Sequence, residues 1–323
     1  MKVDFASNDA ELNFFISEGE QYKVNDIKIY LDASILDPNT LYAELKLKKD
    51  KIFNIKKLRK DVELIKTAVA DLGYAFTTVK YDINKNEKEN IADIVFNVIP
   101  GKKVYINDVI ISGNSRTLDR AVRRNVFLAH GDLFNLTDLN DSKRKLGRTG
   151  YFDKTTINQK RLSDTKMDLL VNVVEAPTGS LMVGGGYGSY QGIEFTASIT
   201  DKNIWGSGLG IGLSTEISKV SSDFTLSLTN PAINDSDYTG DVKIYKDTRE
   251  ISYTDYKMNK DKVGFSVGTG KYITRNTNLG ARYRLETIQE TFDNDLEDQE
   301  YIKSSITPYL KFNNTDDFYL PRE

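Results

Sequence analysis

The sequence contains no cysteine and one histidine, His130. Without cysteine, the chain can form neither disulfide bonds nor thiolate metal sites, which suits a compartment where free thiols would be oxidised. A single histidine leaves little room for zinc or catalytic-triad chemistry, so we expect no metal, no cofactor and no enzymatic activity. No run of about eighteen apolar residues is present, so no transmembrane helix is predicted, although the alternating strands of a barrel are not excluded by this.

An excess of one charge is also lacking. The chain has 44 lysines and arginines against 47 aspartates and glutamates, a formal net charge of −3, and the two signs are interspersed. No basic stripe is available, so we expect no nucleic-acid partner. The N-terminus has no secretory signal, because acidic and polar residues stand where an apolar core would be. Either the mature chain has been trimmed, or the sequence is a piece whose leader lies upstream. We expect the second, because residues 12–19 have the pattern of the last strand of a repeat, which would make residues 1–20 the remnant of a preceding repeat.

One α/β pattern occurs twice before Pro177. The segment at 18–27 reappears 82 positions later at 100–109, with Asn-Asp between apolar residues in both. Each unit is predicted to run strand, helix, helix, strand, strand. In the first, Asn54 caps a long helix with three-four apolar spacing, and Gly73 ends it. The expected elements are a strand at 24–31, helices at 38–47 and 55–72, and strands at 74–83 and 91–99.

The second unit, residues 102–177, follows the first, residues 21–101, on the same plan. Its first helix is expected near residues 118–128. Phe53-Asn54 is matched 81 positions later and Gly73-Tyr74 only 77 positions later, so the second long helix is about one turn shorter. Losing a whole turn preserves the buried face of the helix.

Residues 178–323 alternate with a period of two, which predicts about eight antiparallel strands. The alternation would suit either a soluble sandwich or an outer-membrane barrel. Several strands exceed ten residues, which favours the barrel. Aromatic residues near strand ends would suit an interfacial girdle: Trp205, Tyr238, Tyr272 and Tyr309. We expect Phe195, Ile211, Leu226 and Phe312 to face lipid, and Thr196, Gly212 and Thr225 to face the lumen.

Several short motifs carry a family resemblance. Gly113-Asn114 with Thr117, and Gly150-Tyr151-Phe152, resemble signatures of the polypeptide-transport-associated (POTRA) repeats in the BamA family of outer-membrane assembly factors. The barrel opening of that family is similar to four segments in the same order: residues 178–180, the glycine-rich 184–188, the turn 201–208 and residues 229–231. The resemblance implies α+β POTRA repeats in the periplasm, followed by an all-β antiparallel transmembrane β-barrel in the outer membrane of a Gram-negative cell.

The resemblance implies a membrane insertase that accepts nascent strands at POTRA edges and at a lateral seam. Its implied partners are unfolded outer-membrane proteins, accessory outer-membrane lipoproteins, periplasmic chaperones and the lipid bilayer. Arg123 and Arg124 are expected as solvated helix residues, or else as a lipoprotein contact. The implied seam is the first barrel strand: Ser180, Leu181, Met182, Val183, Gly184, Gly185, Gly186, Tyr187 and Gly188.

Residues 178–323 would form the N-terminal half of such a barrel. A half-barrel exposes two unpaired edges, so we expect this polypeptide alone not to be a competent insertase. One alternative is a POTRA-barrel polypeptide transporter of the two-partner secretion type. Another is a barrel enzyme, because residues 264–268 match the Gly-x-Ser-x-Gly pattern of serine hydrolases. That motif must join a strand to a helix, whereas here the alternation predicts a continuous strand.

Overall fold

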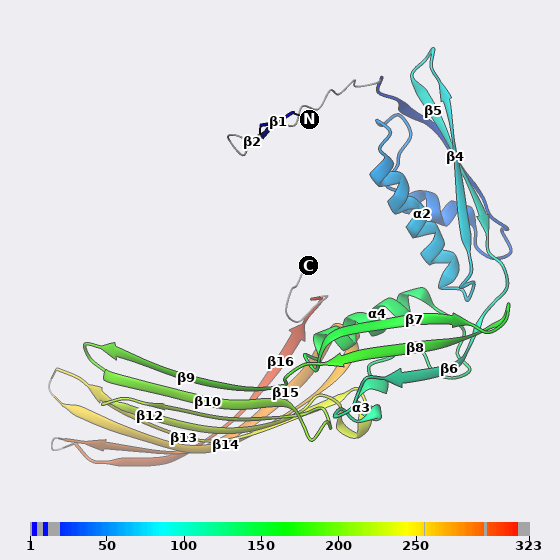
Figure 1. Ribbon diagram of the computed structural model, residues 1–323. Helices are drawn as coiled ribbons and strands as arrows, with labels where there is room; N and C mark the ends of the chain where they lie inside the picture. Colours follow the sequence, from blue (N-terminus) through cyan, green and yellow to red (C-terminus); the bar gives the residue numbers. More distant parts are fainter. Residues whose placement is uncertain (1, 5–8, 12–19, 255, 294–295, 316–323) are drawn as a thin grey trace. The chain divides into compact units, whose positions relative to one another are not determined.

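A computed structural model describes residues 2–4, 9–11, 20–254, 256–293 and 296–315 (Figure 1). The chain divides into two units: residues 1–104 with 133–136, and residues 105–132 with 137–323. Short strands β1 (Lys2–Asp4) and β2 (Asp9–Glu11) pair with each other. The strand predicted at 12–19 lies outside the described residues. Among the described residues, no helix combines the length and apolarity needed to cross a bilayer.

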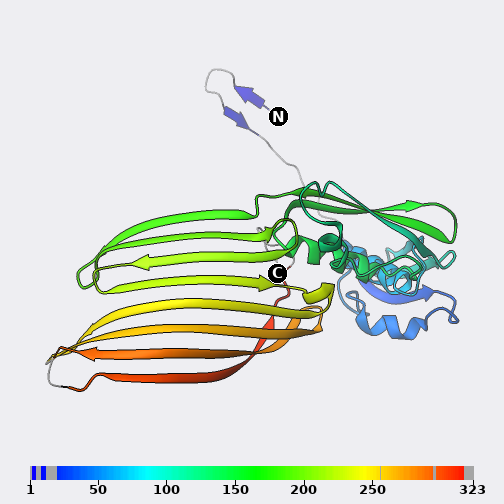
Figure 2. The same cartoon turned by 90° about the horizontal axis from the view of Figure 1, so that it is seen from below.

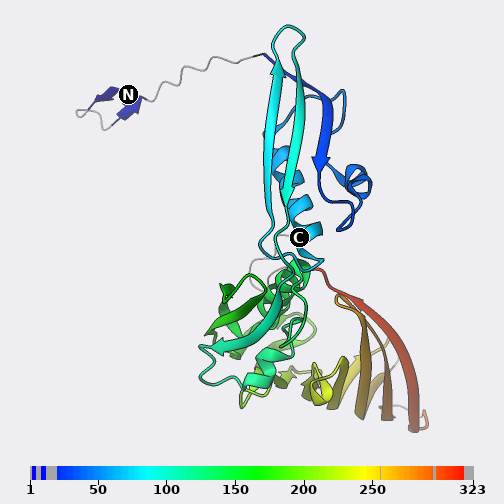
Figure 3. The ribbon, with the colours of Figure 1, turned by 90° about the vertical axis from the view of Figure 1, so that its right-hand side faces the viewer.

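The first α/β repeat is a three-stranded sheet of order β3-β5-β4, with β3 parallel and β4 antiparallel to β5. The long helix α2 follows one face of this sheet (Figure 3). Asn54 caps it, accepting from the Lys56 amide at 2.8 Å. The elements are β3 (Lys23–Tyr30), α1 (Pro38–Glu44), α2 (Ile55–Ala70), β4 (Thr78–Asn86) and β5 (Ile91–Ile99).

The core of this repeat lies between α2 and the sheet. Leu58 and Ile65 on the helix and Phe96 on β5 are fully buried. Asp61 is buried in the same layer, and its carboxylate accepts from the backbone amides of Lys46 and Leu47 at 2.5 and 2.9 Å. These two bonds compensate for the loss of water around the carboxylate, so a charge can lie on the buried face.

The second α/β repeat has the same topology, with sheet order β6-β8-β7. Its first helix is shorter than predicted, because the Asn125 side chain donates to the Ala121 carbonyl at 2.8 Å and the chain leaves the helix in a turn. Its long helix has 13 residues against 16 in α2, close to the predicted difference. The elements are β6 (Tyr105–Ser112), α3 (Asp119–Arg123), α4 (Leu136–Arg148), β7 (Phe152–Arg161) and β8 (Lys166–Glu175).

The remaining strands form one eight-stranded antiparallel sheet in chain order (Figure 2). This confirms the predicted strand number. A short 3-10 turn, η1 (Ile233–Asp235), joins the fourth strand to the fifth. The strands are β9 (Gly179–Gly188), β10 (Gly192–Ile204), β11 (Leu209–Ile217), β12 (Ser221–Asn230), β13 (Tyr238–Ser252), β14 (Lys257–Thr274), β15 (Thr277–Phe292) and β16 (Gln299–Phe312).

Cross-strand registers determine the two faces of this sheet, because directly paired residues lie on the same face. Leu213, Leu226, Ile244 and Phe265 form one such row, and their side chains are exposed or partly exposed. Ser214 and Thr225 pair in the neighbouring row on the opposite face. The seven residues assigned from the sequence divide between the faces as predicted. That the apolar face meets lipid stays a prediction.

Two of the expected girdle aromatics lie on the polar face. Tyr309 pairs with Gly280, and a Cβ built on that glycine would come within 2.4 Å of the tyrosine ring. Tyr272 pairs with Asn278 on the same face. The girdle assignment is therefore wrong for both residues, because strand parity and not nearness to a strand end decides the face. The Gly-x-Ser-x-Gly segment lies inside β14 and is followed by further strand, so it forms no nucleophile elbow.

Candidate functional site

All nine predicted seam residues lie in β9, an edge strand of the large sheet. β9 pairs with β10 in an unbroken ladder from Gly179↔Asp201 to Gly188↔Gly192. No described strand pairs with its other side. Its apolar side chains are among the most exposed in the described chain, with Leu181 at 73% and Tyr187 at 81%. β9 therefore carries exposed apolar surface along its length.

Glycine replaces side chains on the polar face of β9. A Cβ built on Gly184 would lie 2.8 Å from the Thr196 hydroxyl, and one built on Gly186 would meet nothing within 4 Å. Cross-strand side-chain contacts supply much of the stability of a strand pair. The middle of β9 is therefore held to β10 mainly by its backbone hydrogen bonds.

Both ends of β9 are tied more firmly. Near its start, the Ser180 hydroxyl lies 2.8 Å from the Thr200 hydroxyl. Beyond its other end, the Tyr190 hydroxyl donates to the Glu250 carbonyl at 3.3 Å and accepts from the Ser252 amide at 3.1 Å. These contacts fix the β9–β10 hairpin tip to β13, while the glycine-rich middle has no comparable side-chain contact.

The turn between β10 and β11 docks on the second α/β repeat. Asn203 is buried, and its side chain accepts from the Gly208 amide at 2.7 Å and donates to the Thr117 hydroxyl at 2.8 Å. The Leu118 amide donates to the Gly206 carbonyl at 2.9 Å. A Cβ on Gly206 would lie 1.9 Å from the Arg116 carbonyl oxygen. Only glycine fits there, so this turn is shaped for contact with the repeat.

Glu175, at the end of β8, holds the other side of this junction. Its carboxylate accepts from the backbone amides of Arg116 and Thr117 at 2.8 and 2.6 Å, and from the Ser115 hydroxyl at 3.0 Å. Burial alone would raise the pKa of Glu175, but these hydrogen bonds outweigh burial and lower the pKa from its ordinary 4.5. The ionised carboxylate therefore orders the loop on which Asn203 docks.

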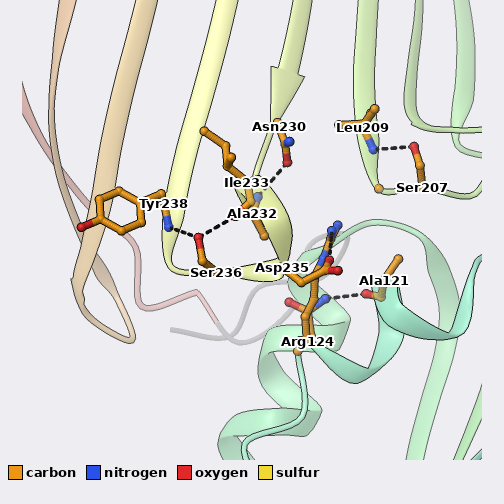
Figure 4. A network of polar contacts seen from close by, with 12 residues as sticks. Ala121, Arg124, Ser207, Leu209, Asn230, Ala232, Ile233, Asp235, Ser236 and Tyr238 are labelled. Carbon is orange, nitrogen blue, oxygen red and sulfur yellow. Dashed lines mark hydrogen bonds and ion pairs between the residues drawn. The ribbon is translucent and has the colours of Figure 1, made fainter.

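The structure places Arg124 inside the junction. Its side chain is 8% exposed, and one guanidinium nitrogen donates to the Asp235 carboxylate at 3.1 Å (Figure 4). The expectation that Arg124 is a solvated helix residue is therefore wrong. Arg123 is half-exposed and pairs with Asp119 on its own helix at 2.9 Å. That either residue contacts a lipoprotein stays a prediction, and Arg124 retains little surface for it.

Two further junction residues differ in their sequence signal: Tyr151 belongs to the Gly150-Tyr151-Phe152 motif, whereas Arg275 belongs to no motif. The Tyr151 hydroxyl donates to the Gly208 carbonyl at 3.1 Å, and Arg275, in the β14–β15 turn, pairs with Asp138 and Asp141 on α4. The two glycines of the 201–208 turn, Gly206 and Gly208, both have left-handed backbone, and such glycines mark a close approach of two backbone segments.

Comparisons with known proteins agree with this architecture. The family model described as "Surface antigen variable number repeat", POTRA, matches residues 22–101 and 104–176, and the "Omp85 superfamily domain" matches residues 203–323. The outer membrane protein assembly factor BamA of Nitratidesulfovibrio vulgaris is 32% identical over 310 residues, covering 94% of this chain and 38% of the relative. BamA of Neorickettsia risticii is 25% identical over 320 residues, covering 96% and 43%.

Solved structures share the fold. BamA from Haemophilus ducreyi lacking POTRA domains 1–3 has a TM-score of 0.68 at 21% identity, covering 93% of this chain and 61% of that one. CdiB from Acinetobacter baumannii has a TM-score of 0.50 at 11% identity, covering 95% and 62%. The chain spans about two fifths of the length of the curated BamA relatives above.

These matches define the class of protein as a POTRA-bearing β-barrel protein. The chain belongs to the Omp85 superfamily, in the group that contains the BamA assembly factors. It is an outer-membrane protein whose POTRA repeats lie in the periplasm. The predicted fold class is confirmed.

Proposed function

We propose that this protein assembles and inserts outer-membrane β-barrel proteins, with β9 as the strand at which a client first pairs. The observation that supports this most directly is the make-up of β9. It has exposed apolar side chains and a middle stretch in which glycines take the place of cross-strand packing. Such a strand pairs weakly through its side chains, so its backbone groups could exchange partners with an incoming strand.

The physical reason for a templating edge lies in the bilayer. A lone strand in hydrocarbon leaves its backbone amides and carbonyls without partners, at a cost of several kcal/mol for each group. Pairing with β9 would satisfy one side of an incoming strand as it enters. The free energy would come from the client's own strand pairing and apolar burial, so we propose a non-enzymatic mechanism that uses no nucleotide or cofactor.

The POTRA repeats would act earlier on the client. Each described three-stranded sheet has two outer strands, β3 and β4 in the first repeat and β6 and β7 in the second. An extended polypeptide can add to such an edge by strand augmentation. Unfolded outer-membrane proteins, delivered by periplasmic chaperones, are the proposed clients, and accessory lipoproteins are the proposed partners on the helical side near Arg123.

A polypeptide transporter of the two-partner secretion type is the second candidate. The similarity in fold to CdiB supports the transporter as an alternative, although this similarity concerns the fold alone. The two functions differ in where the client passes: beside β9 into the membrane for assembly, or through the lumen for secretion.

Photo-crosslinking tests the proposal. A photoreactive residue at Val183, on the apolar face of β9, should capture an unfolded client barrel added to the reconstituted complete protein. Leu226, on the same face but in the interior strand β12, is the matched control and should capture little. Capture at Thr225 on the opposite face, without capture at Val183, would contradict the assembly route and favour passage through the lumen.

A further inference from the structure

A cavity of about 460 Å³ lies between the second α/β repeat and the turns of the large sheet. Residues from α4 and the end of α3 line one side of it. The β12–β13 and β14–β15 turns and Asn313 line the other. Four cationic side chains reach this cavity: Arg124, Lys145, Arg148 and Arg275. Cavities of a few hundred Å³ are the usual size for small-molecule sites.

Two of the four cations are neutralised within the chain. Arg124 pairs with Asp235, and Arg275 pairs with both Asp138 and Asp141. Asp141 is in turn shared with Arg144. These groups balance one another, so they add little net charge to the cavity.

The other two cations have no carboxylate within ion-pair distance among the described residues. Arg148 donates to the neutral oxygens of Asn276 and Asn313, at 2.9 and 3.0 Å. The Lys145 ammonium lies over the Phe127 ring, 4.7 Å from its centroid. Among the described residues, Asp237 is the one further carboxylate that lines the cavity. Lys145 and Arg148 together therefore exceed the negative charge of the described carboxylates at the cavity by about one unit.

The pKa shifts of Lys145 and Arg148 agree with this excess of positive charge. Burial lowers the pKa of Lys145, Asp237 raises it, and the charges of Arg148, Arg124 and Arg275 lower it further, with a net decrease. Burial likewise lowers the pKa of Arg148. A partly buried cation that is repelled by its neighbours gains free energy when an anion enters.

We propose that this cavity binds an oxyanion of the phosphate type, with Lys145 and Arg148 as its charged ligands. Arginine and lysine together with nearby amides suit a group that offers several acceptor oxygens. The cavity is larger than one phosphate requires, so the group can be free phosphate or the headgroup phosphate of a lipid. A bound anion would contact α4 together with the sheet turns, and would thereby strengthen the attachment of the repeat to the sheet.

Titration of the complete protein in detergent with inorganic phosphate tests this, with chloride at matched ionic strength as the salt control. Calorimetry should show saturable binding that Lys145→Gln weakens at least about ten-fold, the effect of losing one charge-assisted hydrogen bond. Lys143→Gln removes the same charge from an exposed position on the same helix and should leave binding unchanged. Lys145→Arg keeps the charge and should retain binding.

The remaining outcomes are decisive as well. Tighter binding of glycerol 3-phosphate than of phosphate, together with competition by phosphatidylglycerol nanodiscs, would identify a lipid headgroup as the source. Equal binding without that competition would identify the free ion. Equal loss in Lys143→Gln and Lys145→Gln, a response to ionic strength alone, or no saturation in the folded protein would overturn the site.

Discussion

The substitution Gly206→Ala should loosen the junction between the second repeat and the sheet. Gly206 has a φ of +68°, where an L-residue costs about 1–2 kcal/mol. Its new Cβ would also lie 1.9 Å from the Arg116 carbonyl oxygen and 3.0 Å from the Thr117 Cα. Backbone atoms cannot rotate away, so the turn must move off the repeat. The bonds between Leu118 and Gly206 and between Asn203 and Thr117 would then be lost.

Each of these two hydrogen bonds contributes about 0.5–1.5 kcal/mol, so the junction should weaken by about 1–3 kcal/mol beyond the backbone strain. Hydrogen exchange of the Leu118 amide, which donates across the junction, should accelerate about 5- to 150-fold.

Gly131→Ala provides the matched control for this substitution. Gly131 has a φ of +87° in the same unit, and a Cβ there meets nothing within 4 Å. It therefore introduces the strain without the clash, and Leu118 exchange should change far less. Equal acceleration in both variants would refute the docking argument.

Three further predictions concern the core, pH and the sheet faces. Ile65→Asp should lower the free energy of unfolding of the first repeat by about 3 kcal/mol or more, because it buries an unpaired charge. Ile55→Asp, at an exposed position of the same helix, should change that free energy by less than about 1 kcal/mol. Because the pKa of Glu175 is lower in the folded protein, its carboxylate stabilises the junction fully above pH 4.5, and this stabilisation is lost as the pH falls through the lower folded pKa. Amide exchange at the junction, corrected for the intrinsic effect of pH on exchange, should show this loss. A Glu175→Gln variant that kept the same pH dependence would disprove it. Single-cysteine labels should be quenched by lipid-phase probes at Leu226 and not at Thr225, and the reverse order would invert the two faces.

Local patterns in the sequence predict most of the fold. The three-four spacing after Asn54 identifies α2 and its buried side, and two-residue alternation identifies the strands and their faces. The girdle assignment of Tyr309 was wrong, but the two-residue alternation places this residue on the correct face. Tyr309 shares the parity of Thr307 and Lys311, so its position on the polar face follows from the pattern, and its closeness to the strand end was the wrong guide.

The junction could not be predicted in the same way, because its partners are far apart in the sequence. Arg124 and Asp235 are 111 residues apart, and Arg275 lies 134 residues from Asp141. Neither pair has a periodic signature. The left-handed glycines at 206 and 208 indicate a tight turn, but only the fold reveals that the turn contacts Thr117 and Tyr151. The charge excess around Lys145 likewise depends on which carboxylates the fold brings near.

Locking the seam tests the proposed function most directly. The locking bond would be a disulfide between a cysteine at Gly185 of β9 and one on the closing strand of the complete protein, and the given sequence contributes no competing thiol because it has no cysteine. Insertion of an unfolded client barrel into liposomes should stop when the disulfide is oxidised and recover when it is reduced. If the oxidised protein inserted clients at the rate of the reduced protein, β9 would not be the strand at which clients enter.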